Sequence, residues 1–422
     1  MNVSAHRAFS FLRTYGYERV SCSKEERAVA EALLNECKSL GVSAQLEEFT
    51  VPCGRVSHAL LRVTSPYVKE YEVTGYERAA STPEGGLDTE FLYVENADEV
   101  LLEQAKGKIV LVNGYLNRAT YEKLRKAEAA AILTFTGRTI DRESESDLNR
   151  CKLRETLTEP FGAVPVLNMR AASAAEIVRR GAKTVHIELT GECYDGTSQN
   201  VCATIPGTDK PSEVITLGGH YDSVYFSSGV HDNLSGSVIV LELLRYFAAH
   251  PPRRTLRFCW FGSEEQGLLG SKAYVKAHAD ELKACVAMLN FDVAAPTLGS
   301  NHLVTLATDD ALHYVAGVLR EAGYGVRAKQ DTYSSDCIPF ADNGVPAINL
   351  TRFGANGADY MHNRHDSLKS GYLDEHALDI TLQQGFVLLD RLANAASFPI
   401  KREIAPEIRQ KVDEYLFKAK KE

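Results

Sequence analysis

The segment Val214-Ile-Thr-Leu-Gly-Gly-His-Tyr-Asp222 decides the fold class of this chain of 422 residues. Its first four residues form a short continuous apolar run, which is the pattern of a strand buried on both faces of a sheet. Two glycines end the run, and a histidine and an aspartate follow. Because ligands of open α/β sheets bind beyond the carboxyl ends of the strands, His220 and Asp222 are candidates for chemistry.

The same alternation of strand, loop and helix continues toward the C-terminus. Apolar runs predict strands at 255–261, 286–291, 303–307 and 346–350. Helical periodicity predicts helices at 235–249, 267–278, 311–322 and 372–396, and a further helical period lies around residues 404–415. Buried strands alternating with helices predict a mostly parallel, mixed sheet sandwiched by helices.

The N-terminal part and a long internal stretch differ from this pattern. Ser23 and Glu26 form a capping box that begins a helix ending at Gly41, and an alternating strand follows at 44–51. Residues 66–197 mix strands (108–112, 131–135, 164–167, 184–189) with a helix (121–131) and a charge-dense loop (138–155). We therefore predict a main domain of residues 1–65 and 198–422, interrupted by an inserted smaller α+β domain of residues 66–197.

The composition excludes several classes of protein. Lys and Arg number 47 and Asp and Glu 56, so the net charge of −9 disfavours binding to nucleic acid or to anionic membranes. No stretch approaches the roughly 20 apolar residues of a membrane span, and residues 1–20 do not resemble a secretory signal. The nine cysteines, with no C-x-x-C among them, are interpreted as reduced, buried small hydrophobes. These features predict a cytoplasmic protein, and they leave its oligomeric state open.

Potential ligands follow nearly every predicted strand of the main domain. His220 follows the first strand, Glu264 and Glu265 the second, and Asp292 the third, whereas Asp232 precedes the helix at 235 and His362 follows the last strand across a loop. Two histidines and three carboxylates (Asp232, Glu265 and Asp292) can hold two divalent ions if one carboxylate bridges them. Such mixed ligands suit zinc, with manganese or cobalt as alternatives. Glu264 then remains as a general base, and Asp222 is placed to orient His220.

Each of these residues has an ordinary structural explanation when it is taken alone. Asp232-Asn233 is typical of a turn or a helix cap, Glu264-Glu265 of a solvated helix start, and Asp292 of a cap for the following element. His365 competes with His362 as the ligand. These separate explanations do not account for the set as a whole, because chance would have to place all six residues along one edge of the sheet.

Five ordered motifs give the set a family resemblance. His220-Tyr-Asp222-Ser, Asp232-Asn-Leu-Ser-Gly236, Ser263-Glu-Glu-Gln-Gly267, Asn290-Phe-Asp292 and His362-Asn-Arg-His-Asp366 resemble the co-catalytic zinc exopeptidases. That family includes bacterial leucyl aminopeptidase, aminopeptidase Y and glutamate carboxypeptidase II. The match runs in order over about residues 200–370, and the stretch before it resembles the protease-associated insert of some members.

The resemblance implies a role for each site residue. One zinc would be held by His220 and Asp292 and another by Glu265 and His362, with Asp232 bridging. Glu264 would be the general base and Asp222 the residue that orients His220. The segments 334–336 and 340–346 resemble the lining of the family's substrate pocket, and we expect the substrate to contact Asp336, Tyr360 and Arg352.

The sequence departs from the family pattern in particular places. Val293-Ala-Ala-Pro296 follows Asp292 where relatives usually have Met or a similar residue and then Gly. Cys337 stands where many relatives have His, and His231 before Asp232 is unusual. The lack of a secretory signal departs from the family's many secreted members.

The predicted function is a zinc-dependent aminopeptidase that releases N-terminal residues from peptides. An acidic environment from Glu264, Asp331 and Asp336 would favour a substrate's α-amine. If Arg352 instead faces the cleft, a bound α-carboxylate would be favoured, which is the carboxypeptidase or dipeptidase alternative. A non-catalytic binding homologue and a glutaminyl cyclase are further alternatives.

Overall fold

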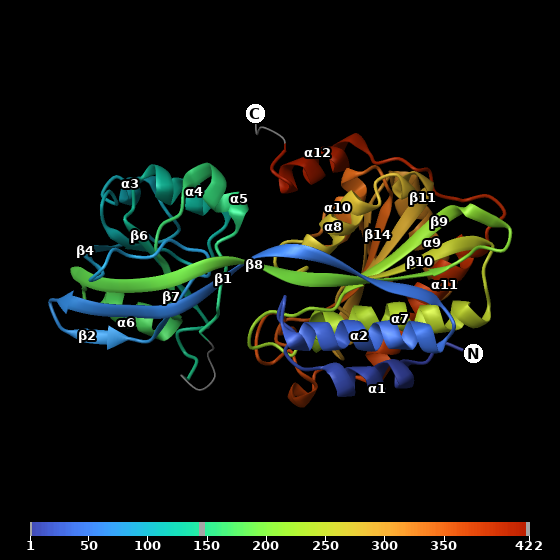
Figure 1. The fold of residues 1–422 in the computed structure, drawn as a ribbon, viewed down its shortest axis with the longest axis horizontal. Coiled ribbons are helices and arrows are strands. Elements are labelled where there is room, and N and C mark those ends of the chain that lie inside the picture. The colour runs from blue at the N-terminus through green and yellow to red at the C-terminus, as the bar shows by residue number, and fades with distance from the viewer. Residues whose placement is uncertain (1, 143–147, 419–422) are drawn as a thin grey trace. The chain divides into compact units, whose positions relative to one another are not determined.

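The computed structural model describes residues 2–142 and 148–418. The chain divides into two compact units. The main unit consists of Met1–Val51 and Thr197–Glu422, and the inserted unit of Pro52–Gly196. The first boundary lies earlier than the predicted residue 66, because strand β1 (Ser43–Ser65) runs without a break from one unit into the other (Figure 1). None of the described helices is long and apolar enough to cross a membrane.

The main unit is built on a mixed sheet whose central pairs are parallel. The strand order is β13 (Arg327–Gln330), β12 (Gly299–Leu306), β14 (Ala347–Gly354), β11 (Cys285–Phe291), β9 (Lys210–His220), β10 (Arg254–Phe261) and β8 (Thr184–Ile205). The pairs β14–β11, β11–β9 and β9–β10 are parallel, as is β12–β13, whereas β12–β14 and β10–β8 are antiparallel. The predicted fold class is confirmed.

Helices cover both faces of this sheet (Figure 1). One apolar core lies beneath α1 (Ala5–Tyr15), α2 (Lys24–Ser39), α7 (Ser235–Ala249), α9 (Asp309–Glu321) and α11 (Glu375–Asn394). A second core lies under α8 (Leu269–Ala277), α10 (Cys337–Asp342) and α12 (Pro406–Tyr415). Trp260 and Phe258 are fully buried on β10, as predicted, and α12 packs Ile408 and Val412 on its own unit.

Local sequence signals explain where α2 begins. The Ser23 side chain accepts a hydrogen bond from the Glu26 amide, which is the first half of the predicted capping box. The Glu26 carboxylate accepts instead from the amide of Cys22. Helix α1 is not among the helices predicted from the sequence, although Ser4 caps it and Ala8, Phe9 and Leu12 are buried at helical spacing.

The inserted unit has its own sheet and its own cores. Strands β4 (Leu87–Tyr93), β5 (Ile109–Leu111), β6 (Ala131–Thr136) and β7 (Val166–Arg170) pair in parallel in that order. Strands β3 (Val73–Gly75) and β8 add antiparallel edges, and β2 (Lys69–Tyr71) pairs with β1. The helices are α3 (Glu99–Leu102), α4 (Arg118–Lys126), α5 (Glu155–Phe161) and α6 (Ala171–Arg179).

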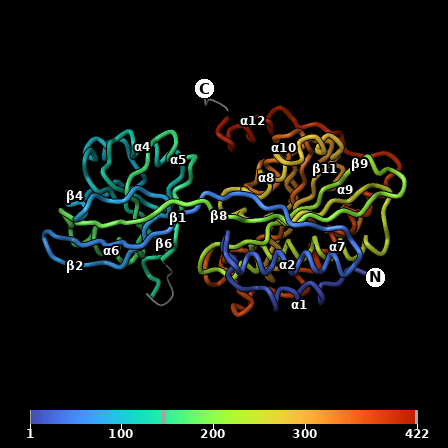
Figure 2. The backbone as a smooth tube through the Cα atoms, viewed as in Figure 1, coloured from blue at the N-terminus to red at the C-terminus, as the bar shows by residue number. Residues whose placement is uncertain are grey.

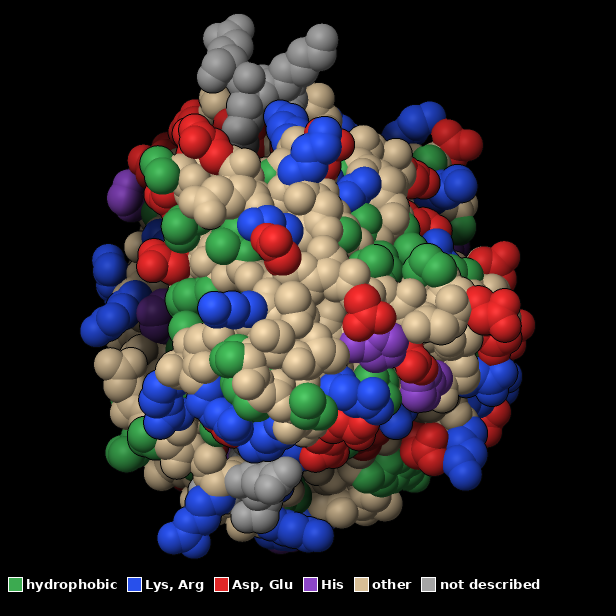
Figure 3. All heavy atoms as spheres, turned by 90° about the vertical axis from the view of Figure 1, so that its left-hand side faces the viewer, with side chains coloured by type: hydrophobic (Ala, Val, Ile, Leu, Met, Phe, Trp, Pro, Cys, Tyr) green, Lys and Arg blue, Asp and Glu red, His purple; other side chains and the backbone are tan. Residues whose placement is uncertain are grey.

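Other features of the inserted unit bear on the sequence predictions. Strands β1 and β8 pair with each other and carry the chain into and out of this unit (Figure 2). Acidic and basic side chains are interspersed over the face seen in Figure 3. Of the predicted charged loop, residues 143–147 lie outside the described residues. The parts at 138–142 and 148–154 contain no helix or named strand, whereas Glu155 begins α5.

The expectation that all the cysteines are buried is wrong for four of them. None of the nine forms a disulfide among the described residues, and five are buried: Cys37, Cys202, Cys259, Cys285 and Cys337. Cys22, Cys53 and Cys151 are half-buried and Cys193 is exposed. These four lie outside the apolar runs from which burial was inferred.

Candidate active site

The predicted ligands converge at the carboxyl end of the central strands. His220 is the last residue of β9, and Asp292 follows directly after β11, its parallel neighbour. Asp232 lies in the short segment η2 (Val230–Leu234) that leads into α7. Glu265 lies in the turn after β10, and His362 in the loop after β14. Parallel pairing therefore brings residues from distant parts of the chain to one edge of the sheet.

Asp232 lies between the two histidines. Its Oδ1 is 3.2 Å from Nε2 of His220, and its Oδ2 is 3.0 Å from Nε2 of His362. Asp292 Oδ1 is 3.7 Å from the same nitrogen of His220, and Glu265 Oε2 is 3.2 Å from that of His362. Three groups of three ligand atoms thus form, each within 4.8 Å. Two of them share Asp232, and the third consists of His220, Glu264 and Glu265. The structure places His362 at the cluster, whereas His365 packs against the ring of Tyr360.

The cluster concentrates negative charge in a poorly solvated place. Asp232 and Asp292 are 7% and 4% exposed. Burial opposes the charged form of His220, but Glu264, Asp222, Asp232 and Asp292 outweigh it and raise its pKa well above the ordinary value. Glu265, together with Asp232, likewise raises the pKa of His362. The carboxylates therefore stabilise positive charge at both imidazoles.

These donors fit a metal. Grouped carboxylates at this burial need compensating positive charge, and the arrangement of imidazole nitrogens and carboxylate oxygens matches the ligands that zinc takes in proteins. Asp222 supports one histidine from behind, with Oδ1 3.3 Å from Nδ1 of His220, which leaves Nε2 facing the other ligands. The candidate site therefore contains both the ligand atoms and a group that orients one of them.

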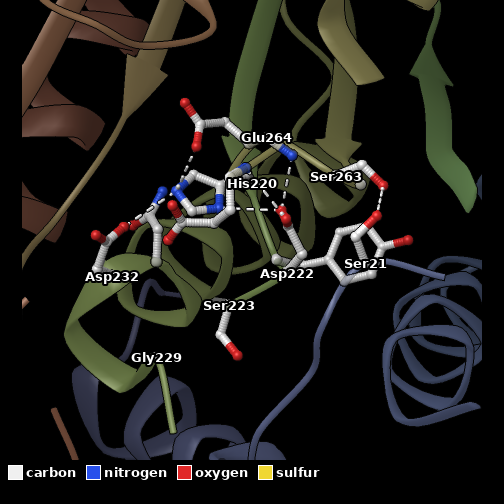
Figure 4. Close-up of polar contacts among 12 residues, drawn as sticks. Ser21, His220, Asp222, Ser223, Gly229, Asp232, Ser263 and Glu264 are labelled. Atoms are coloured by element: carbon white, nitrogen blue, oxygen red, sulfur yellow. Dashed lines mark hydrogen bonds and ion pairs between the residues drawn. The ribbon is translucent and has the colours of Figure 1, made fainter. Parts of the chain in front are cut away.

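Asp222 also holds the residue predicted as general base. It accepts hydrogen bonds from the backbone amides of Glu264 at 3.0 Å and Glu265 at 3.2 Å (Figure 4). Burial raises the pKa of Glu264 well above its ordinary value; His220 opposes this, and the charges of Glu265, Asp336 and Asp292 add to it. The Glu264 carboxylate reaches toward His220, with Oε2 3.8 Å from Nε2.

Asp366, the last residue of the fifth motif, fixes the Asp232 backbone. Its carboxylate accepts from the amides of His231 at 2.7 Å and Asp232 at 3.0 Å. The unusual His231 is fully buried, and its Nδ1 donates to the carbonyl of Ala294 at 2.7 Å. The loop that carries His362 is thereby tied to the segment that carries Asp232.

The three residues predicted to contact the substrate lie in different surroundings. Tyr360 is half-buried in the His362 loop, where its ring packs on Tyr372. Asp336 is 1% exposed, and burial raises its pKa to about 7, so it lies beneath the surface. The Arg352 guanidinium is directed to the carbonyls of Pro296 and Thr297 and to the Asn301 side chain, and its contact with substrate stays a prediction.

The sequence analysis did not single out Tyr333. Burial, followed by the charges of Asp292, Asp232 and Glu264, raises the pKa of its phenol well above the ordinary value. The phenol therefore lies within electrostatic reach of the cluster. In the sequence, Tyr333 directly precedes the segment 334–336, which was expected to line the substrate pocket. That position was the sequence feature that pointed to Tyr333.

Comparisons with known proteins agree with this geometry. The model of peptidase family M28 matches residues 200–383. Aminopeptidase YwaD of Bacillus subtilis (strain 168) is 26% identical over 409 residues, covering 93% of this chain and 84% of the relative. Carboxypeptidase Q of Mus musculus is 27% identical over 274 residues, 62% of this chain and 58% of the relative.

A solved structure matches nearly the whole chain. The zinc aminopeptidase BSAP from Bacillus subtilis superposes with a TM-score of 0.78, covering 96% of this chain and 99% of that structure at 21% identity. The fold is therefore that of this metallopeptidase. The segment that the model of peptidase family M28 matches, residues 200–383, contains the whole ligand cluster.

Proposed function

We propose that this chain is a zinc-dependent aminopeptidase that takes peptides as substrates and binds two zinc ions. The observation that carries the proposal is that the two carboxylate oxygens of Asp232 face two different histidines, at 3.2 and 3.0 Å. His220 and Asp292 would hold one ion, and Glu265 and His362 the other, with Asp232 shared. When bound, such ions polarise the scissile carbonyl and increase the acidity of water.

The chain's own residues supply the proton transfer. Glu264 lies outside the two groups that share Asp232, and its Oε2 is 3.8 Å from Nε2 of His220. It would take a proton from the attacking water at its carboxylate and deliver it to the nitrogen of the leaving amine. Asp222 keeps the Glu264 backbone in place, so that the carboxylate need not reorganise during the reaction.

Two observations favour cleavage at the N-terminal end of the peptide substrate. The match to the B. subtilis aminopeptidase extends over 93% of this chain. Arg352, the residue considered for binding an α-carboxylate, has its guanidinium occupied by acceptors of its own unit. The similarity to carboxypeptidase Q keeps the carboxypeptidase or dipeptidase reaction as the second candidate. Aminoacyl-nitroanilides assayed beside N-blocked dipeptides separate the two reactions.

Glu264→Gln tests the chemistry. The amide cannot accept the proton, so kcat should fall by about 10²–10⁴-fold, while metal content and the unfolding transition stay those of the wild type. Glu407→Gln, an exposed change on α12, serves as the matched control. Unchanged kcat in Glu264→Gln would show that another group is the base. Wild-type protein without affinity for zinc, manganese or cobalt would instead favour a non-catalytic binding protein.

Two further parts of the proposal come from the sequence. We propose a cytoplasmic location from the cysteine pattern. We also propose that the inserted unit is protease-associated-like and shapes access to substrate. Among the described residues, the ligand groups all lie in the main unit, which supports the second of these roles.

A further inference from the structure

Arg19 is a buried arginine whose guanidinium binds backbone carbonyls of the loop between two ligands. The residue is 0% exposed. Its Nε donates to the carbonyl of Tyr221 at 2.7 Å, its Nη1 to that of Ser228 at 2.6 Å, and its Nη2 to that of Gly229 at 2.8 Å. One side chain therefore joins the start and the end of the loop that follows β9.

The backbone of Arg19 binds the same loop. Its amide donates to Ser223 Oγ at 2.9 Å, and the Ser223 amide donates to the carbonyl of Arg19 at 3.1 Å. Figure 4 shows Ser223 and Gly229 on the side of the loop away from the Glu264 carboxylate. Arg19 thus supports the loop without occupying the space among the ligands.

Two of these three carbonyl contacts lie close to the ligand positions. Tyr221 directly follows His220, and Gly229 comes three residues before Asp232. We propose that Arg19 is a positioning residue that sets the separation of His220 and Asp232 by clamping both ends of the loop between them. The inference rests on the proposed function, because it assigns Arg19 to the geometry of that metal site.

The chemistry of the side chain suits this role. A guanidinium has donors in a rigid planar fork, so it can hold several carbonyls at fixed angles, whereas an ammonium is a single flexible point charge. Burial lowers the pKa of Arg19 to about 10, against the nearby charges of Asp366, Asp222 and Asp232, so the group stays protonated at neutral pH. The Arg19 Nη1 also donates to the carbonyls of Tyr15 and Tyr17. These hydrogen bonds connect the guanidinium to the residues at the end of α1.

Arg19→Lys tests the proposal, because it keeps the charge and loses the fork. Zinc affinity of the folded protein is measured by competition with a chromogenic chelator, and stability by urea unfolding of the metal-free protein. We expect at least a tenfold weaker zinc affinity, since groups that support metal ligands typically contribute 10–100-fold. The measurement needs no substrate, so it is independent of catalytic turnover.

Arg254→Lys is the matched control. Arg254 is also 0% exposed and donates to the carbonyls of Leu392 and Ala395, away from the ligand cluster. Its replacement should lower stability and leave zinc affinity unchanged. If Arg19→Lys lowers stability but leaves zinc affinity unchanged, as expected for Arg254→Lys, then Arg19 stabilises the fold without positioning the ligands. That result would overturn the proposal.

A milder change keeps the test decisive if Arg19→Lys does not fold. Ser223→Ala removes the hydroxyl that receives the Arg19 amide and leaves the guanidinium contacts. We expect zinc affinity to fall severalfold, and wild-type affinity in this variant would count against the clamp. Wild-type protein that fails to bind zinc would refute the proposed function itself, which distinguishes the two failures.

Discussion

Glu26 accepts a hydrogen bond from the backbone amide of Ser263 at 3.1 Å, so a buried side chain of α2 holds the residue immediately before Glu264. The same carboxylate accepts from the Ser198 hydroxyl at 2.8 Å. Asp222 accepts from the next two amides, those of Glu264 and Glu265. Three consecutive amides of the turn after β10 are therefore fixed by two carboxylates.

Glu26→Gln should change how stability depends on pH. Burial, aided by the charge of Asp222, raises the pKa of Glu26 to about 8 from an ordinary 4.5, although its hydrogen bonds oppose the rise. Between those values the folded state binds the extra proton, so the free energy of unfolding falls as pH rises toward 8. The glutamine of the variant does not titrate, so its free energy of unfolding should not fall with pH in this way. At about 1.4 kcal/mol per pKa unit, the fall that disappears is on the order of 2 kcal/mol or more between pH 6 and pH 9. Urea unfolding of chelator-treated proteins at pH 6 and pH 9 measures it, and parallel curves for the two proteins would contradict it.

Asp232→Ala should lose metal as well as activity. Removing the shared carboxylate takes a ligand atom from both groups, so metal content should fall below two ions per chain and kcat by at least about 10³-fold. Elemental analysis after dialysis checks the content. Asp310→Ala, on the exposed start of α9, is the control that should keep both. A variant that retained two ions would show that Asp232 does not bridge.

Arg352→Met should affect stability and not catalysis. The guanidinium satisfies two carbonyls and an amide oxygen within the main unit, and unsatisfied buried acceptors cost about 1–3 kcal/mol. We expect that loss in urea unfolding, with kcat/KM within about twofold of the wild type. A large rise in KM at unchanged stability would instead indicate that Arg352 contacts the substrate.

Tyr333→Phe should slow the reaction with little effect on stability. Burial and the charges of Asp292, Asp232 and Glu264 raise the pKa of the phenol, so its hydroxyl stays protonated and could donate to charge that develops on the substrate. We expect kcat to fall by about 10²-fold, with KM and zinc affinity unchanged. Tyr314→Phe on α9 is the control, and equal kcat for both variants would remove Tyr333 from the mechanism.

The ligand cluster could be predicted because its members obey a local rule. His220 and Asp292 each stand at the end of an apolar run, and parallel strands bring such ends together. Asp232, Glu265 and His362 occupy the loops that follow or precede the same elements. Strand order and side-chain contacts were not needed to place these residues at one edge of the sheet.

The supporting residues could not be predicted in the same way. Arg19 and Glu26 act through contacts with loops some two hundred residues away, and neither local periodicity nor motif spacing contains that information. Glu26 did carry a local signal, but the signal indicated a helix cap. The direction of Arg352 also depends on a neighbouring loop, because its acceptors lie at 296, 297 and 301.

The placement of Asp232 between an earlier and a much later histidine has a consequence for biosynthesis. A growing polypeptide on the ribosome has His220 and Asp232 long before it has His362, so it emerges with half of its ligand set. A prematurely terminated product that ends before the last loop lacks that histidine for good. Under the proposed function, hydrolytic capacity would therefore arise only once translation has passed residue 362.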